Sequence, residues 1–176
     1  MSMSRHLFKS LFFVFLLSGC SVTTPVVTQK KTEQLSLLLG SLDASIPKHE
    51  ANRLAVDILR ETNRLTQAFE LTSPPLFHNF LVNAGLREKG LCYQWSDALY
   101  DHLSKRDYPS FSFHLFGANI GEYFTEHNTL VVTKKGEASQ EGIVIDPWRN
   151  SGELYFSTIK EDTAYHWIHR PQRGCL

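Results

Sequence analysis

The hydrophobic pattern of this chain changes its period once, near Pro109, and this change constrains the fold more than any other feature. Before it, apolar side chains recur every three to four residues, the spacing of one face of an α-helix. After it, Phe111, Phe113 and Leu115 alternate with polar residues, the period of a half-buried strand. Helices followed by strands predict an α+β fold, with helices packed on an antiparallel sheet.

The pattern predicts four helices and four strands. The expected helices span residues 35–42, 47–69, 73–85 and 92–103, and the expected strands 110–115, 128–133, 142–146 and 153–156. The charged run 61–64 is interpreted as a solvated helix face. About 140 residues follow the first 34, which is enough for one core, so residues 35–176 are predicted to form a single domain.

The first residues read as a targeting segment. Arg5 and Lys9 precede a short apolar run, residues 11–17, too short for a bilayer core that needs about 20 residues. Leu17-Ser18-Gly19-Cys20 resembles a bacterial lipobox, which implies cleavage after residue 19 and a lipid on the sulfur of Cys20. An ordinary secretory signal with a chance cysteine is the alternative. Ser21, where an Asp would resemble an inner-membrane retention signal, favours the outer membrane facing the periplasm of a Gram-negative bacterium.

Residues 20–34 are polar and Thr-rich, and they are interpreted as the lipidated cysteine and a flexible tether. Without Arg5 and Lys9 the 18 basic residues become 16, against 18 acidic ones, a net charge of −2. This balance gives no support for nucleic acid as a partner. The expected partners are the lipid bilayer, through acylated Cys20, and an envelope protein or peptidoglycan peptide.

Cys92, His127 and Asp146 form the candidate catalytic set. Cys92 begins a predicted helix, where the partial positive charge of the helix start favours a thiolate. His127 and Asp146 lie at the ends of two consecutive predicted strands. An imidazole can take the thiol proton, and a carboxylate can hold the imidazole in the useful tautomer. The pattern predicts a thiol nucleophile, with His114 as a reserve base.

Three segments resemble the papain-like superfamily, most closely its transglutaminase-like branch. They are Gly90-Leu91-Cys92-Tyr93-Gln94-Trp95, the strand from Glu126 to Val132, and the strand from Ile143 to Trp148, within residues 75–150. The three candidate residues follow one another at intervals of 35 and 19 residues. The resemblance implies a cysteine at the start of a core helix, packed on an antiparallel sheet, with histidine and aspartate on neighbouring strands.

The chain departs from papain-type peptidases in having no Gln shortly before Cys92 as a side-chain oxyanion donor. Asn79 and Asn83 are therefore the candidate donors beside the Cys92 backbone N–H. Trp148, next to Asp146, is a candidate for the substrate groove.

The predicted function is a membrane-anchored, exported thiol enzyme that cleaves or transfers an amide, as a peptidase or amidase or as a transamidase. A non-catalytic lipoprotein with the same fold is the alternative, with Cys92 either a buried filler or bridged to Cys175. His166 and His169 have a spacing that suits a metal, but no third ligand lies nearby. Nothing in the sequence requires a metal or an organic cofactor.

Overall fold

Five antiparallel strands form one sheet in the computed structural model, which describes residues 28–122 and 125–170. The strands are β1 (Phe111–Ala118), β2 (His127–Lys134), β3 (Ile143–Asp146), β4 (Tyr155–Thr158) and β5 (Ile168–His169), in the spatial order β4-β3-β2-β1-β5. The helices among these residues are α2 (Gln29–Gly40), α3 (Lys48–Ala68), α4 (Pro75–Asn83) and α5 (Cys92–Ser104). The predicted α+β class is confirmed.

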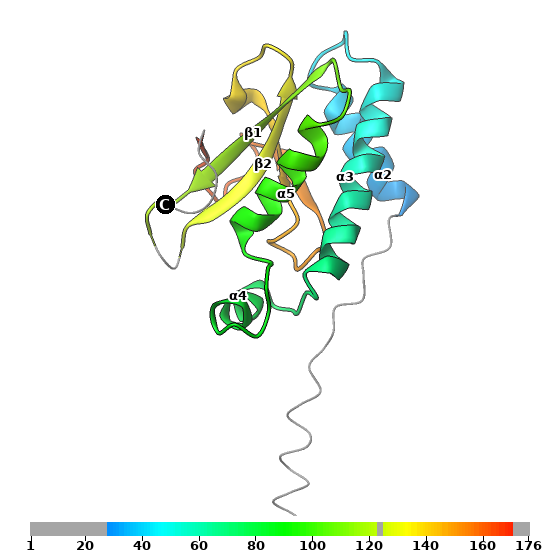
Figure 1. Ribbon diagram of the computed structural model, residues 1–176. Helices are drawn as coiled ribbons and strands as arrows, with labels where there is room; N and C mark the ends of the chain where they lie inside the picture. Colours follow the sequence, from blue (N-terminus) through cyan, green and yellow to red (C-terminus); the bar gives the residue numbers. More distant parts are fainter. Residues whose placement is uncertain (1–27, 123–124, 171–176) are drawn as a thin grey trace, which may run out of the picture.

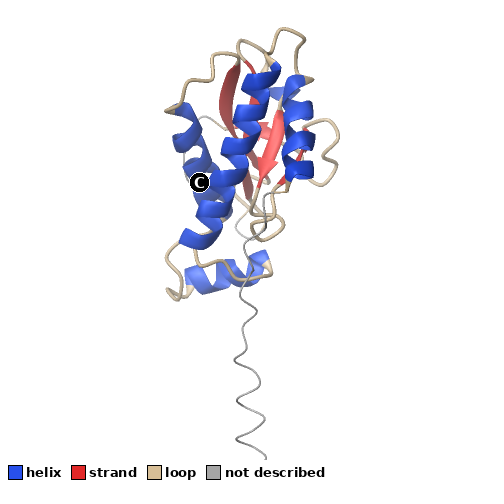
Figure 2. Ribbon diagram, turned by 90° about the vertical axis from the view of Figure 1, so that its right-hand side faces the viewer, coloured by secondary structure: helices blue, strands red, loops and turns tan. Residues whose placement is uncertain are grey.

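Helices α2, α3 and α5 lie on one face of the sheet, and α4 lies below them in Figure 1 (Figures 1 and 2). Helix α5 packs directly on β1 and β2, α3 packs on α5, and α2 packs on α3. Leu130 and Val132 of β2 point into this helix layer and join the main core. Trp95 of α5 is buried there, its ring edge-on to Phe69 with centroids 4.9 Å apart. This packing fixes the start of α5 against the start of β2.

The opposite face of the sheet carries a smaller apolar cluster. Val131 and Val144 lie on this face, alternating along their strands with the residues of the main core. The segment that joins β4 to β5 covers them with Tyr165 and Trp167. Both faces of the central strands are therefore buried.

Helix α2 begins at Gln29, six residues before the predicted start, so residues 29–34 do not belong to the tether. The reason is a cap that the leucine pattern does not reveal: the side chain of Thr28 accepts a hydrogen bond from the N–H of Lys31 at 3.2 Å. The predictions for residues 1–27, including lipidation of Cys20, lie outside the described residues, as does Cys175.

Two other predictions need correction. The run 61–64 is not a solvated face, because Glu61 and Thr62 are only 4% and 1% exposed. Strand β5, which was not predicted, is a two-residue strand that pairs with β1. No helix in the part of the chain that the structure describes is long and apolar enough to cross a membrane.

Candidate active site

The loop before Cys92 is held in place by the helix that follows it. The side-chain oxygen of Gln94 accepts hydrogen bonds from the N–H groups of Gly90 at 2.7 Å and Leu91 at 3.0 Å. The indole N–H of Trp95 donates to the Gly90 carbonyl at 3.2 Å. Since Trp95 is anchored in the core, these bonds fix Cys92 as the first residue of α5.

Buried His78 closes this loop from the other side, a role that the sequence analysis missed. Its Nδ1 accepts from the N–H of Thr72 at 3.2 Å, so its proton lies on Nε2, which donates to the Lys89 carbonyl at 2.9 Å. Gly90 has a φ of +131°, and a Cβ there would lie 2.1 Å from Nε2 of His78. Only glycine fits this approach, and the approach sets the position of the cysteine.

His127 and Asp146 meet because of the register between β2 and β3. Leu130 pairs with Ile145, so continuing the register places Asp146 across from Thr129, diagonal to His127 on the same face. Nε2 of His127 lies 2.7 Å from Oδ2 of Asp146, and both side chains are buried, at 2% and 1% exposure.

Contacts with both partners set the protonation of His127. Burial lowers its pKa, but the charge and hydrogen bond of Asp146 and the nearby Cys92 thiol outweigh burial and raise the pKa to about 9. Asp146 occupies Nε2, which leaves Nδ1, a buried atom with no hydrogen-bond partner among the described residues, as the nitrogen that is available to the thiol. At neutral pH the imidazolium form is favoured, which stabilises a neighbouring thiolate.

Aromatic rings enclose the His127 imidazole. Its centroid lies 4.7 Å from the rings of Trp148 and Tyr165 and 5.4 Å from that of Trp167. The indole N–H of Trp148 donates in turn to Oδ1 of Asn79 at 3.0 Å. These contacts hold the ring plane and keep water from the Asp146–His127 hydrogen bond.

A second ion pair supports Asp146 from behind. Nε of Arg149 lies 2.9 Å from Oδ2 of Asp146, and its terminal nitrogens bind both oxygens of Asp162 at 3.0 and 2.6 Å. Burial raises the pKa of Asp146, but the charges and hydrogen bonds of His127 and Arg149 outweigh it and lower the pKa. Trp167 donates to Asp162 at 2.9 Å, which ties this chain of charges to the aromatic cage.

Asn128 lies on the other side of the sulfur. Its Nδ2 is 3.8 Å from Sγ of Cys92, and the Glu126 carbonyl oxygen is 3.9 Å from the same atom. Oδ1 of Asn128 accepts from Arg170, which also pairs with the Glu126 carboxylate at 3.1 Å. None of these three residues was predicted to belong to the site.

The structure therefore brings Cys92, His127 and Asp146 together. The two predicted oxyanion donors do not lie beside the sulfur. Asn79 accepts a hydrogen bond from Trp148, and Asn83 is the exposed last residue of α4. The amide that reaches the sulfur instead comes from the strand that carries His127.

Two further candidates are now placed. Trp148 is half-buried against His127. His114, the reserve base, has its Nε2 3.0 Å from the Thr133 hydroxyl and its ring beside His169, away from the triad. Burial, followed by the charge of His169, lowers the pKa of His114.

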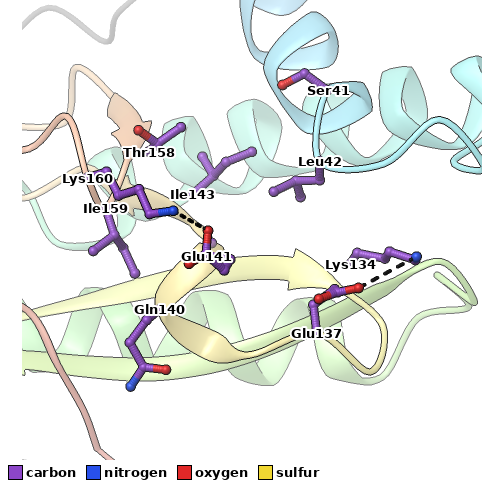
Figure 3. A pocket seen from close by; sticks show the side chains of 11 residues that line it. Ser41, Leu42, Lys134, Glu137, Gln140, Glu141, Ile143, Thr158, Ile159 and Lys160 are labelled. Atoms are coloured by element: carbon purple, nitrogen blue, oxygen red, sulfur yellow. Dashed lines mark hydrogen bonds and ion pairs between the residues drawn. The ribbon is translucent and has the colours of Figure 1, made fainter.

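Cys92 is a buried thiol among the residues that the structure describes, and the alternative of a bridge to Cys175 concerns a residue outside them. The thiol is 6% exposed, so a substrate would approach through a narrow opening. A cleft of about 430 Å³ lies at the opposite end of the sheet. Its lining residues include Lys134 and Ile143 (Figure 3). It is separate from the triad, because Ile143 starts β3 and Asp146 ends it.

Within residues 28–122 and 125–170 no group of three His, Cys, Asp or Glu side chains is arranged to hold a metal ion. A thiol beside an imidazole that is hydrogen-bonded to a carboxylate can carry out nucleophilic attack on a carbonyl with proton transfer. No protein family, curated protein or solved structure matches this chain.

Proposed function

We propose that this chain is an exported, lipid-anchored cysteine enzyme that cleaves or transfers an amide in the cell envelope. In this proposal its domain is papain-like, closest to the transglutaminase-like branch. The single observation that supports it most is the series formed by Cys92, His127 and Asp146, with one imidazole nitrogen on the carboxylate and the other directed to the thiol. A histidine placed only for stability has no need of a thiol on its second nitrogen.

The proposed reaction follows from this geometry. The Cys92 thiolate attacks the amide carbonyl carbon, a C–S bond forms, and the π electrons move to oxygen. When the carbonyl re-forms, the C–N bond breaks and His127 donates its proton to the leaving amine. Water or a second amine then attacks the thioester, which releases an acid or a new amide and returns the thiol.

The lipid anchor is the second part of the proposal, and it rests on the lipobox-like residues 17–20. Acylated Cys20 would leave residues 21–27 between the lipid and the cap of α2 at Thr28. Fully extended, these seven residues reach roughly 25 Å, so the enzyme would work close to the membrane surface. Substrates fixed in the envelope, such as a protein or a peptidoglycan stem peptide, suit this short reach.

The test compares wild-type protein with Cys92→Ala on purified sacculi and on envelope proteins, in the presence and absence of a fluorescent primary amine. If the enzyme hydrolyses amides, wild type should release new free amino groups. If it transfers them, wild type should incorporate the fluorescent amine into its product. Cys92→Ala should do neither. His102→Gln is a matched control, because His102 lies in a polar cluster between α3 and α5. Equal products from wild type and Cys92→Ala would contradict the proposal.

One observation favours a second candidate, a non-catalytic envelope lipoprotein that binds a partner. Cys92 and His127 are only 6% and 2% exposed, less than an open active site requires. In this case the partner would bind elsewhere, and Cys92 would react as an ordinary buried thiol. The rate at which Cys92 is alkylated separates the two candidates.

A further inference from the structure

Arg170 brings a buried charge to the side of Cys92 opposite His127. It follows β5, and its N–H donates to the Leu115 carbonyl at 2.7 Å, which extends the pairing of β5 with β1. Its side chain is 4% exposed and reaches Asn128 and Glu126 on β2 and just before it. The end of the chain thus contributes directly to the surroundings of the nucleophile.

Arg170 determines which way the Asn128 amide points. A guanidinium has only N–H donors, so the Asn128 atom that faces Nη1 of Arg170 must be the oxygen. The NH₂ group of Asn128 is then directed to Sγ of Cys92, at 3.8 Å, and to the Glu126 carboxylate, at 3.2 Å. Without Arg170 the amide would be able to rotate and present its oxygen to the sulfur.

Stability alone gives a poor account of Arg170. Its Nε and Nη2 are buried and have no hydrogen-bond partner among the residues that the structure describes. A buried charge with unsatisfied donors is costly, and one ion pair, here with Glu126 at 3.1 Å, often does no more than offset that cost. The other contact of Arg170 is the one with Asn128, and its effect is on the amide beside Cys92.

We propose that Asn128 is the side-chain oxyanion donor for the carbonyl attacked by Cys92, and that Arg170 is the positioning residue that orients its amide. This inference rests on the proposed thiol chemistry and deepens it. When the thiolate adds to the carbonyl carbon, the π electron pair moves to oxygen, and the Asn128 N–H donates a hydrogen bond to that oxygen without losing its proton. The charge is stabilised until the C–N bond breaks.

The geometry suits this division of roles. Asn128 and His127 are consecutive residues of β2, so their side chains lie on opposite faces of the strand. The proton-transfer group and the oxyanion donor therefore flank the sulfur from two sides. Cys92 is also the first residue of α5. Backbone N–H groups in the first turn of a helix have no carbonyl partner within the helix, so in this proposal the Cys92 N–H is the second oxyanion donor.

Two reactions of Cys92 in the full chain test the inference. Iodoacetamide alkylates the thiolate by displacement at a saturated carbon and forms no oxyanion, whereas p-nitrophenyl acetate acylates it through a tetrahedral oxyanion. We expect Asn128→Ala to slow acylation by about 10²–10³-fold, as for loss of one oxyanion donor. Alkylation should change by less than about threefold, because the thiolate and His127 are retained.

Arg170→Met should slow acylation by at least about tenfold, and in the Asn128→Ala background it should cause no further loss, because it acts through that amide. Asn52→Ala, an exposed position on α3, is the matched control. Should a variant fail to fold, Asn128→Ser and Arg170→Lys, which keep a smaller polar group and the charge, take its place.

Acylation by Asn128→Ala within about threefold of wild type would overturn the role of Asn128. Independent, multiplying losses from the two substitutions would overturn the positioning role of Arg170. Failure of the proposed function has a different signature: wild-type Cys92 would then be alkylated no faster than in His127→Gln.

Discussion

Two of the histidines that the structure describes, His102 and His127, lie against carboxylates, and only His127 is arranged as a base. In the helix layer, Nε2 of His102 is 2.8 Å from Asp57 and Nδ1 is 3.3 Å from Glu61, so both nitrogens face an acid. At the end of the sheet, His127 gives one nitrogen to Asp146 and keeps the other for the thiol. A carboxylate beside a histidine is therefore not enough to indicate catalysis. The group that faces the second imidazole nitrogen determines whether the histidine can act as a base.

The surroundings of the two histidines also differ, in their exposure to water and in the groups they contain. Asp57 also accepts from the Tyr108 hydroxyl at 2.8 Å and pairs with Arg106 at 2.7 Å, and it is partly exposed. That cluster ties α3 to α5 and to the start of the sheet. The cluster around Asp146 is closed by aromatic rings and ends at a nucleophile. One cluster holds helices together, and the other prepares a proton transfer.

Removing the acid from each cluster should give the largest difference between them. Asp146→Ala leaves His127 and Arg149 buried without their shared partner, so we expect the free energy of unfolding to fall by about 3–5 kcal/mol. Asp57→Ala should cost about 1–2 kcal/mol, because its partners reach water or Glu61. Urea denaturation of both variants measures this. Equal losses would mean that the two clusters are alike.

The second-largest difference is expected in the pH dependence of the free energy of unfolding. The pKa of His127 is about 9 in the folded protein, above its ordinary 6.5, so folding favours the protonated ring. This contribution is complete below pH 6.5 and is lost as the pH rises through about 9. Wild type should therefore lose stability across this window, and His127→Gln should lose less. Identical slopes in urea denaturation would contradict the charge assigned to His127.

Gly90 tests whether the catalytic cluster depends on the backbone before Cys92. With φ at +131° and His78 in the space of a Cβ, Gly90→Ala should cost more than about 2 kcal/mol. Gly136→Ala is the control, because Gly136 also has a positive φ, +86°, but nothing lies near its Cβ position. Its cost should be about 1 kcal/mol, from the backbone alone. Thermal denaturation of the two variants makes the comparison, and a smaller cost at Gly90 would be the contrary outcome.

The smallest effect is expected for His102. His102→Gln should change the rate of Cys92 alkylation by less than about twofold, because His102 lies near the other end of α5, roughly 15 Å along the helix from Cys92. Its cost should appear in stability, at about 1 kcal/mol, from the lost hydrogen bonds to Asp57 and Glu61. A strong loss of Cys92 reactivity would show that the two clusters are coupled through α5.

Much of the fold could be predicted from the sequence, because the hydrophobic patterns that indicate its helices and strands are local. The period change placed α5, β2 and β3 within a residue or two, and the order of Cys92, His127 and Asp146 predicted residues that the register of β2 and β3 brings together. Helix α4 was placed well too, but its apolar stripe was not a core face. Leu76 and Phe80 are 66% and 61% exposed.

The rest depends on contacts between distant segments. Asn128 and Arg170 are 42 residues apart, and Arg170 directly follows a strand of two residues that shows no alternation. Arg149 and Asp162 are charged residues of loops, and His78 lies within helix α4. Nothing in the local pattern of these residues distinguishes a partner of the triad from a surface charge.

The most direct test of the account is the pH dependence of Cys92 alkylation by iodoacetamide, followed by mass spectrometry, in wild type and in His127→Gln. We predict fast labelling of wild type that persists below neutral pH, because the imidazolium holds the thiolate, and loss of that behaviour in the variant. Slow labelling of both proteins, rising only at the pH of an ordinary thiol, would contradict the thiolate–imidazolium pair and with it the proposed enzyme.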